Sequence, residues 1–279
     1  NEEIEQLPPD VKAAMDKALA DRKGYFDAHH FVGYYHSSSG NESLLYMVFT
    51  EPVDDQAREL LEIFCANVAI TYESLLLREE IQDTQRSTVY IIGEAVEQRS
   101  KETGAHVRRV GELAALLADS VGLPPAEVEF MRQAAPLHDV GKIGIPDRVL
   151  NKPGPLDEEE WAVMKTHARI GYELLGKSDK RILKLGAVIA HEHHERWDGQ
   201  GYPRGLAGEQ IHIAGRIVAL ADALDALVSR RCYKEPWTLE AALAHVGEQS
   251  GRIFDPGLVE LLNAKLAEVR AIYRLYPAA

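Results

Sequence analysis

The sequence predicts a mainly α-helical protein, in which a helical bundle follows a small α/β segment and a long linking helix. Three observations support this fold class. Beyond residue 100, apolar residues recur every three or four positions, between loops rich in Gly, Pro and Asp. Residues 54–100 contain no Pro and a single Gly, Gly93. Strand-like composition is confined to two short runs within the first 50 residues.

The first 50 residues predict one helix and one β-hairpin. A helix is expected over 11–19 and strands over 26–35 and 44–49, with the polar cluster at 37–41 forming the turn. One hairpin and one helix are too small to form an independent core. The chain also begins with Asn1 and shows no signal-peptide pattern, so we expect it to be part of a longer protein.

Residues 54–100 predict either one long helix or two helices in succession. Apolar and small polar residues recur at helical spacing from Leu60 to Ile91. Such a helix could form a dimerising, signal-transmitting coiled coil, or it could pack on its own domain. Because Thr and Asn residues interrupt the apolar positions, the sequence leaves both interpretations open.

Seven helices are expected beyond residue 100, over residues 100–121, 125–138, 157–176, 180–194, 210–229, 238–248 and 256–274. Two of them have recognisable N-terminal caps. Asp157 and Glu160 have the spacing of a capping box, and Asp255 precedes a proline at the first helical position, Pro256. The segment 141–156 is rich in Gly, Pro and Asp and is expected to be a loop.

The composition excludes several classes of protein. A formal net charge of −13 argues against a surface for polymeric nucleic acid, which would be basic. No apolar run approaches the roughly 20 residues of a membrane-spanning helix, so no membrane partner is expected. The two cysteines, Cys65 and Cys232, lie far apart and lack metal-ligand spacing. We therefore expect a cytoplasmic protein without a disulfide framework.

The candidate functional residues are histidines and carboxylates on the apolar faces of helices. His106 shares a stripe with Leu113, and His167 shares one with Trp161 and Leu174. Five predicted helices each direct such groups inward: Glu102 and His106, His138 and Asp139, His167, His193 and His194, and Asp222. One histidine on an apolar face is more often a hydrogen-bonded core residue, but the repetition favours a shared site.

The physical chemistry of these groups indicates a metal centre. Burying each of them without a partner would cost several kcal/mol, whereas shared cations would satisfy them together. Mixed nitrogen and oxygen ligands suit Mn, Fe or Zn, and the thiolates of a structural zinc site are missing from the pattern. A structural site closes with four ligands, so a larger set favours two or three ions with open positions for catalysis.

Two motifs resemble those of a known family. His138-Asp139, followed by the residues Gly141 to Pro146, resembles the HD motif of the HD phosphohydrolase superfamily. The stretch from His193 to Pro203, which reads HHERWDGQGYP, resembles the signature of its HD-GYP branch. The similarity runs from about Val89 to Leu266. It implies hydrolysis of cyclic dinucleotides, chiefly cyclic di-GMP, at a centre of two or three metal ions.

The resemblance also implies roles for individual residues. The metal ligands would be His106, His138, Asp139, His167, His193, His194 and Asp222, with Asp139 bridging two ions and Glu102 serving a third. Lys142 would approach the scissile phosphate, and Arg231 and Lys234 would contact the phosphates and guanine. The loop Gly201-Tyr202-Pro203 would flank the pocket and contact diguanylate cyclase domains.

The expected reaction is hydrolysis of cyclic di-GMP to linear pGpG, with further cleavage to GMP left open. An attacking water activated by the metals would displace the 3′ oxygen from phosphorus. One alternative is another cyclic dinucleotide such as cyclic GMP-AMP, or a mononucleotide. A second alternative, from another class, is a sensor that binds a cyclic dinucleotide without turnover.

The expected organisation has three parts. Residues 1–80 resemble part of a GAF-like regulatory segment, as in some bacterial response regulators, residues 81–100 form a helical linker, and 101–279 form the HD-GYP domain. Fe or Mn is the expected metal. A homodimer through the long helix is a further expectation.

Overall fold

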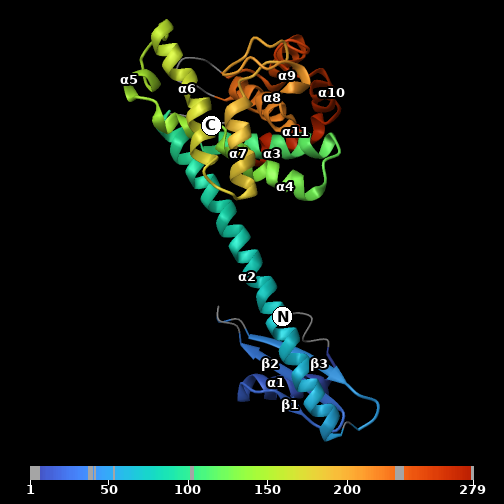
Figure 1. Cartoon of the computed structure of the whole chain (residues 1–279). Helices are drawn as coiled ribbons and strands as arrows, with labels where there is room; N and C mark the ends of the chain where they lie inside the picture. The colour runs from blue at the N-terminus through green and yellow to red at the C-terminus, as the bar shows by residue number, and fades with distance from the viewer. Residues whose placement is uncertain are drawn as a thin grey trace. The chain divides into compact units, whose positions relative to one another are not determined.

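The computed structural model describes residues 7–36, 40, 42–52, 54–100, 104–229 and 236–277. The chain divides into two compact units, Asn1–Thr84 and Gln85–Ala279. Helix α2 (Asp55–Arg99) contributes to both, because its first part belongs to unit 1 and its last fifteen residues to unit 2 (Figure 1).

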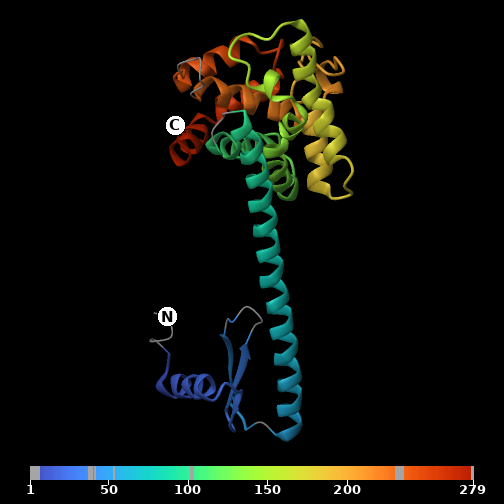
Figure 2. The ribbon, with the colours of Figure 1, turned by 90° about the vertical axis from the view of Figure 1, so that its left-hand side faces the viewer.

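Unit 1 contains a three-stranded antiparallel sheet of order β1-β2-β3. Its elements are α1 (Pro9–Asp21), β1 (Tyr25–Phe26), β2 (His30–His36) and β3 (Glu42–Val48). Figure 2 shows the sheet lying between α1 and the first part of α2. Ala14, Ala18 and Val32 form the small core between α1 and the sheet. The predicted helix and hairpin are therefore present, whereas most of the predicted turn lies outside the described residues.

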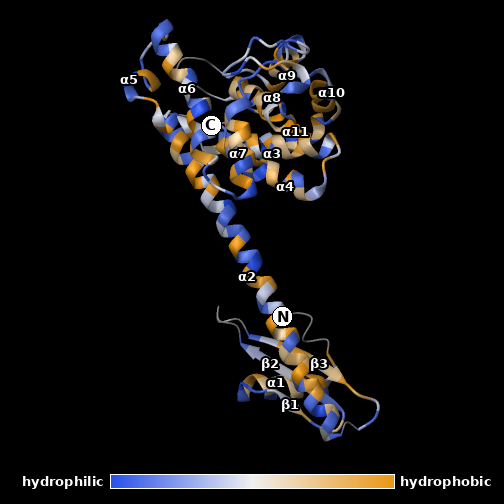
Figure 3. Ribbon diagram, viewed as in Figure 1, coloured by the Kyte–Doolittle hydropathy of each residue, from blue (hydrophilic) through white to orange (hydrophobic). Residues whose placement is uncertain are grey.

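Helix α2 is one continuous helix of 45 residues. Hydrophobic residues recur along it between hydrophilic ones (Figure 3). From Gln56 to Arg99 it is long and apolar enough to cross a membrane, by length and composition alone, with a window of mean hydropathy 1.5. The sequence was expected to contain no apolar run long enough to span a membrane. The helix nevertheless meets the criterion, because isolated polar residues do not lower the mean hydropathy of the window enough. One such helix is weak evidence for a membrane span.

Unit 2 is helical in all its described elements, which confirms the mainly α fold class. Its α-helices are α3 (Gly104–Ser120), α4 (Pro125–Ala134), α5 (Asp147–Leu150), α6 (Glu158–Leu175), α7 (Arg181–Glu192), α8 (Ile213–Val228), α9 (Leu239–Glu248), α10 (Pro256–Ala264) and α11 (Leu266–Leu275). The described residues of unit 2 also contain the 3₁₀ turns η2 (Ala135–Leu137), η3 (Val140–Gly144) and η4 (Gly208–Gln210). The core lies mainly among α3, α4, α8 and the C-terminal helices.

Three expectations about helix boundaries were wrong. The helix expected over 125–138 ends at Ala134, because Pro136 has no N–H to donate and its ring would clash with a preceding carbonyl. The helix expected over 256–274 is two helices, since the backbone at Lys265 leaves the helical region. The expected loop 141–156 contains most of η3 and all of α5.

The predicted caps are confirmed. Asp157 and Glu160 form a reciprocal capping box at the start of α6, and the Asp255 side chain accepts a hydrogen bond from the Gly257 N–H at the start of α10. The predicted stripe on α6 was partly wrong. Trp161 and Leu174 are 47% and 42% exposed, because α6 instead buries the face that contains His167.

Candidate metal centre

Five described segments of unit 2 bring the predicted metal-binding residues together. His106 comes from α3, His138 and Asp139 from the junction of η2 and η3, His167 from α6, His193 and His194 from the end of α7, and Asp222 from α8. Four of the imidazoles are buried, with His138 fully enclosed and His106, His167 and His193 at most 3% exposed. Polar side chains thus converge inside a helical unit whose core is mainly apolar.

Asp139 lies at the centre of this cluster. Its Oδ1 atom is 3.2 Å from Nε2 of His167 and 3.7 Å from Nε2 of His193. Its Oδ2 atom is 3.4 Å from Nε2 of His138 and 2.6 Å from Nζ of Lys142. One carboxylate therefore faces three imidazoles and an ammonium, with each oxygen directed to a different side.

The ligand atoms form two groups that could each hold a cation. Asp139, His167, His193 and His194 offer one group, and Glu97, His106 and His138 offer the other, each with its atoms within 4.8 Å of one another. Asp222 lies beside the second group, with Oδ1 3.5 Å from Nε2 of His106 and 3.8 Å from Nε2 of His138. The arrangement suits two neighbouring cations, with Asp139 and His138 adjacent at the junction.

Hydrogen bonds fix the orientation of four imidazoles. Nδ1 of His138, His167 and His193 lies 3.0, 2.8 and 3.0 Å from the carbonyl oxygens of Ala135, Met164 and Ile189 respectively. A carbonyl only accepts, so each Nδ1 must carry the proton and donate it. Nδ1 of His106 is 2.7 Å from a carboxylate oxygen of Asp225. In the neutral tautomer, Nε2 then presents a lone pair to the cluster, as metal-binding histidines require.

Several atoms of the cluster have no hydrogen-bond partner among the described residues. They are Nε2 of His138, His167 and His193, and Oδ1 of Asp139. A buried polar atom without a partner costs roughly 1–3 kcal/mol, so four such atoms would be costly. Divalent cations would satisfy all four atoms, and the nitrogen and oxygen donors match the preferences of Mn, Fe and Zn.

The electrostatics also point to competition between a cation and protons. Burial disfavours the charged form of His138, but the carboxylates of Asp139 and Asp222 outweigh burial and raise its pKa to about 10. Burial, together with the neighbouring His193 and His167, holds the pKa of His194 well below its usual value. Burial opposes ionisation of Asp139, yet Lys142 and His138 keep its pKa well below normal. A bound cation would replace the proton on His138.

A pocket of about 560 Å³ opens beside the cluster. His193, His194 and Asp222 line it, together with Trp161, Lys165, Gly201 and Tyr202. The Tyr202 ring stacks on His194, with ring centroids 4.7 Å apart. A Cβ at Gly201 would lie 2.4 Å from the Arg196 nitrogen, so only glycine fits this approach of the loop to the chain before it. Pro203 is exposed at the end of this loop.

Sequence reasoning missed the residues that support His106. Asp225 accepts hydrogen bonds from His106 and, at 2.5 Å, from Nε of Arg109, and the pair of Asp225 and Arg109 is fully buried. The spacing in the sequence could have revealed them. Asp225 follows Asp222 by three residues on one face of α8, and Arg109 follows His106 by three residues on α3.

The last turn of α2 also contributes to the site. Glu97 is 1% exposed, and its Oε2 lies 3.7 Å from Nζ of Lys142. Arg99 donates to the carbonyl oxygens of Lys142, Ile143 and Ile145 and pairs with Asp147. The helical spacing of buried Tyr90, Gly93 and Glu97 could have revealed the inward face of this turn.

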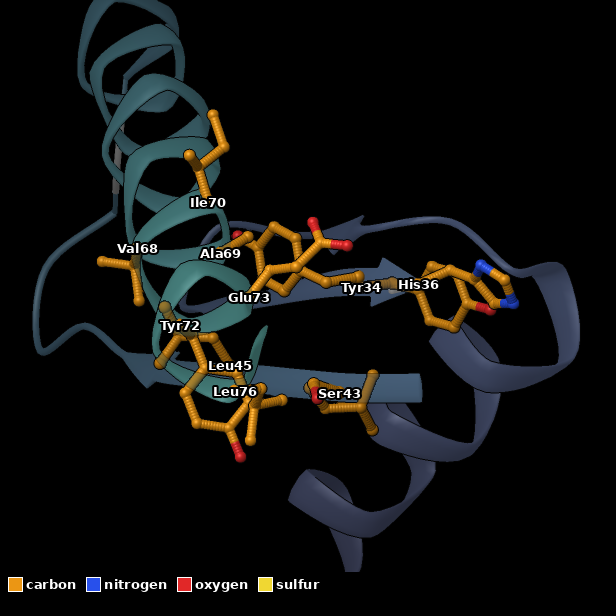
Figure 4. A pocket seen from close by; sticks show the side chains of 12 residues that line it. Tyr34, His36, Ser43, Leu45, Val68, Ala69, Ile70, Tyr72, Glu73 and Leu76 are labelled. Atoms are coloured by element: carbon orange, nitrogen blue, oxygen red, sulfur yellow. The ribbon is translucent and has the colours of Figure 1, made fainter. Parts of the chain in front are cut away.

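The other predicted site residues are not placed. Glu102, Arg231 and Lys234 lie outside the described residues. A second pocket of about 560 Å³ lies in unit 1, between the β2–β3 hairpin and α2, and Tyr34, Ser43 and Leu76 are among its lining residues (Figure 4). The described residues that line it include none of the histidine cluster.

Comparison with known proteins agrees with these observations. Residues 91–258 match the family described as "HD domain", and residues 1–81 match a domain of unknown function, DUF3369. The GAF-like interpretation of the N-terminal segment therefore stays a prediction.

Two curated relatives are similar over much of the chain. A 3′3′-cGAMP-specific phosphodiesterase of Vibrio cholerae is 43% identical over 273 residues, which are 97% of this chain and 52% of the relative. A cyclic di-GMP phosphodiesterase response regulator of Xanthomonas campestris is 49% identical over 206 residues, 73% of this chain and 54% of the relative. The chain thus spans about half the length of these relatives.

A solved structure shares the fold. The crystal structure of a cyclic GMP-AMP-specific phosphodiesterase of Vibrio cholerae superposes with a TM-score of 0.54 at 20% identity, over 68% of this chain and 50% of that one. The family match covers more than half of the chain, which confirms the resemblance read from the motifs. The chain belongs to the HD-domain family, and its sequence contains the HD-GYP motif.

Proposed function

We propose that this chain is a metal-dependent phosphodiesterase that hydrolyses cyclic di-GMP to linear pGpG, with GMP as the product of a second cleavage. The observation that carries the proposal is the set of buried Nε2 atoms that converge on Asp139 without hydrogen-bond partners among the described residues. Divalent cations would satisfy all of these atoms at once. The similarity to curated cyclic-dinucleotide phosphodiesterases supports the choice of reaction.

The metal ligands we propose are His106, His138, Asp139, His167, His193, His194 and Asp222. Two groups of ligand atoms support two ions. Asp139 belongs to the first group, and its Oδ2 lies 3.4 Å from Nε2 of His138 in the second, so it would be the bridging carboxylate. Glu97 is added to the proposal, because it belongs to the same group as His106 and His138. Glu102 would serve a third ion. Fe or Mn is the metal we expect from the mixed imidazole and carboxylate donors.

When bound, the metals would lower the pKa of water and neutralise charge on a phosphoryl group. Among the described residues, Lys142 is well placed to assist, since its ammonium lies 2.6 Å from Oδ2 of Asp139 and only 13% of its side chain is exposed. We propose that it donates to a phosphoryl oxygen as charge builds there. Asp225 would hold His106 in the ligating tautomer.

The pocket has the chemistry of a cyclic-dinucleotide site. Trp161 is 47% exposed at the pocket and offers a face for a base, and Lys165 lies one helical turn further along α6 and offers an ammonium for a phosphate. Arg231 and Lys234 would hold the second phosphate or a guanine. Gly201, Tyr202 and Pro203 would shape the pocket wall next to His194.

A second substrate, 3′3′-cyclic GMP-AMP, is a specific alternative. The relative that matches 97% of this chain is named for that dinucleotide, whereas the response-regulator relative is named for cyclic di-GMP. The two substrates differ in one base, so the ratio of their kcat/KM values decides between them.

The deciding experiment measures metal content and turnover together. Protein purified without oxygen is analysed for metals, and conversion of cyclic di-GMP is followed by chromatography. We expect His138→Ala and Asp139→Ala to lose metal and to abolish hydrolysis, because each removes a central ligand. His245→Ala, on α9 and outside both ligand groups, is the matched control. Unchanged turnover in both ligand variants would refute the proposal.

Tight binding of the dinucleotide by fully metal-loaded protein, without turnover, would instead identify a sensor. The remaining proposals concern cellular context: a cytoplasmic location, a role in a response regulator, and contact of the Gly201-Tyr202-Pro203 loop with a diguanylate cyclase domain. A homodimer through α2 is the fourth, and its geometry is developed below.

A further inference from the structure

A heptad pattern runs along one exposed side of α2. Starting at Leu60, alternate steps of three and four residues give the seam positions Leu60, Ile63, Asn67, Ile70, Ser74, Leu77, Ile81 and Thr84. The same alternation continues within unit 2 through Thr88, Ile91 and Ala95. This spacing is that of positions a and d in a coiled coil, sustained over more than three heptads.

Every residue of this seam is exposed. Leu60, Ile63, Ile70 and Ile81 are between 56% and 68% exposed, and Leu77 is 41% exposed. A row of large apolar side chains in water is unfavourable, at about 25 cal/mol for each Å² left uncovered. The seam therefore requires a partner.

The opposite side of α2 already has its partner. In unit 1, Cys65 is buried and Val68 and Leu76 are half-buried, and these residues occupy heptad positions f, b and c. In unit 2, taken by itself, the buried residues Gly93 and Val96 occupy positions f and b. Ile70 also lines the pocket of unit 1, but neither unit buries a residue at position a or d, so the packing of the helix on its own chain leaves the seam exposed.

The polar residues of the seam point to two parallel helices. Asn67 and Ser74 occupy consecutive a positions, and an asparagine at a single a position specifies the register and the oligomeric state at a cost in stability. This explains why polar residues that appear to spoil a coiled coil are compatible with one. A membrane span is a poorer explanation, because Glu62 and Glu73 would have to lie in hydrocarbon.

The charges beside the seam distinguish parallel from antiparallel pairing. Glu73 at position g and Arg78 at the following e position would meet across a parallel, in-register dimer. Glu80 would meet the neutral Gln85 in the same way. An antiparallel pair would instead bring position g of one helix against g of the other, where Glu73 and Glu80 repel.

We infer that α2 pairs with α2 of a second copy of this chain, as a parallel, in-register, two-stranded coiled coil centred on residues 60–84. Its length would be about 37 Å at 1.5 Å per residue. The partner that covers the seam is thus the α2 helix of a second copy of this chain. The inference rests on the helix surface and is independent of the reaction catalysed by unit 2.

The first test is a pair of matched substitutions in the full 279-residue chain. Leu77→Lys places a charge at seam position d, whereas Leu75→Lys makes the same change at position b, two residues away and 53% exposed. We expect dimer for the unaltered chain and for Leu75→Lys, and monomer for Leu77→Lys, by sedimentation equilibrium. Circular dichroism should show helix content retained in both variants.

A second pair of measurements tests the register. Ile81→Cys should give a disulfide-linked dimer under mild oxidation, since identical a positions meet across a parallel seam, whereas Glu79→Cys at the outer f position should not. Glu73→Arg should weaken the dimer, and adding Arg78→Glu should restore it. A monomeric unaltered chain, equal effects of the two lysine substitutions, or efficient crosslinking only at position 79 would overturn the inference.

Discussion

At the scale of single residues, the hydrogen bond at Nδ1 of each buried imidazole determines that Nε2 faces the cluster. The sequence placed His106, His167 and His193 on inward faces of helices, and periodicity alone was enough for that. It could not indicate which ring nitrogen faces the cluster. That choice depends on local acceptors, such as the Met164 carbonyl one turn before His167, and on Asp225 from another helix.

Lys142 is the residue whose substitution best separates chemistry from metal binding. Lys142→Ala removes a donor to the phosphoryl oxygens but none of the proposed ligands. We expect kcat to fall by about 10²- to 10³-fold, the usual effect of losing one such donor, with metal content unchanged. Lys184→Ala, exposed on α7, is the control. Loss of metal together with activity would show that Lys142 instead supports the fold of the site.

At the scale of elements, the close contact of η3 with α6 positions Asp139 relative to His167. A Cβ at Gly141 would lie 1.9 Å from the His167 carbonyl oxygen and 2.5 Å from the Gly171 nitrogen. The sequence predicted a loop here, since Gly and Pro punctuate it, and periodicity could not foresee such packing. The end of α4 just before Pro136, in contrast, could have been predicted from the sequence, because a helix cannot continue normally through a proline.

Gly141→Ala should therefore disturb two ligands at once. Because the clash is with backbone atoms, η3 must move away from α6, and we expect a loss of about 1–3 kcal/mol in the free energy of unfolding. Metal content should fall as well. Gly247→Ala in α9 is a matched control, since its Cβ would meet nothing within 4 Å, and alanine favours a helix. Urea denaturation of both variants measures the difference, and equal midpoints would contradict this account.

At the scale of the whole molecule, the net charge of −13 was informative about polymeric nucleic acid but not about a small phosphate ligand. A buried cluster of cations reverses the local field whatever the surface charge. The fold class followed from helical periodicity, and the HD-GYP motif directed attention to the site. The exposed seam of α2 was harder to recognise, because only the structure shows which side of a long helix its own chain covers.

Metal binding should also contribute to the stability of unit 2. An ion present at 1,000 times its dissociation constant stabilises the folded state by about 4 kcal/mol, equivalent to a rise in Tm of roughly 8–16 °C for a domain of this size. A chelator should therefore lower Tm in calorimetry, and added Mn²⁺ should restore it. Asp139→Ala, which lacks the central carboxylate, should show no response. An unchanged Tm on chelation of the unaltered protein would contradict a metal-filled core.

The bonds of Arg99 have a practical consequence for dissecting this protein. The guanidinium holds the carbonyls of Lys142, Ile143 and Ile145 from the end of α2. A fragment that started at residue 101 would retain the HD and GYP motifs but lack both Glu97 and Arg99. A minimal fragment that keeps the proposed site should begin no later than residue 85, where the second compact unit starts. If a shorter fragment does not turn over substrate, the result would reflect the loss of Glu97 and Arg99 and would not show that the full chain is inactive.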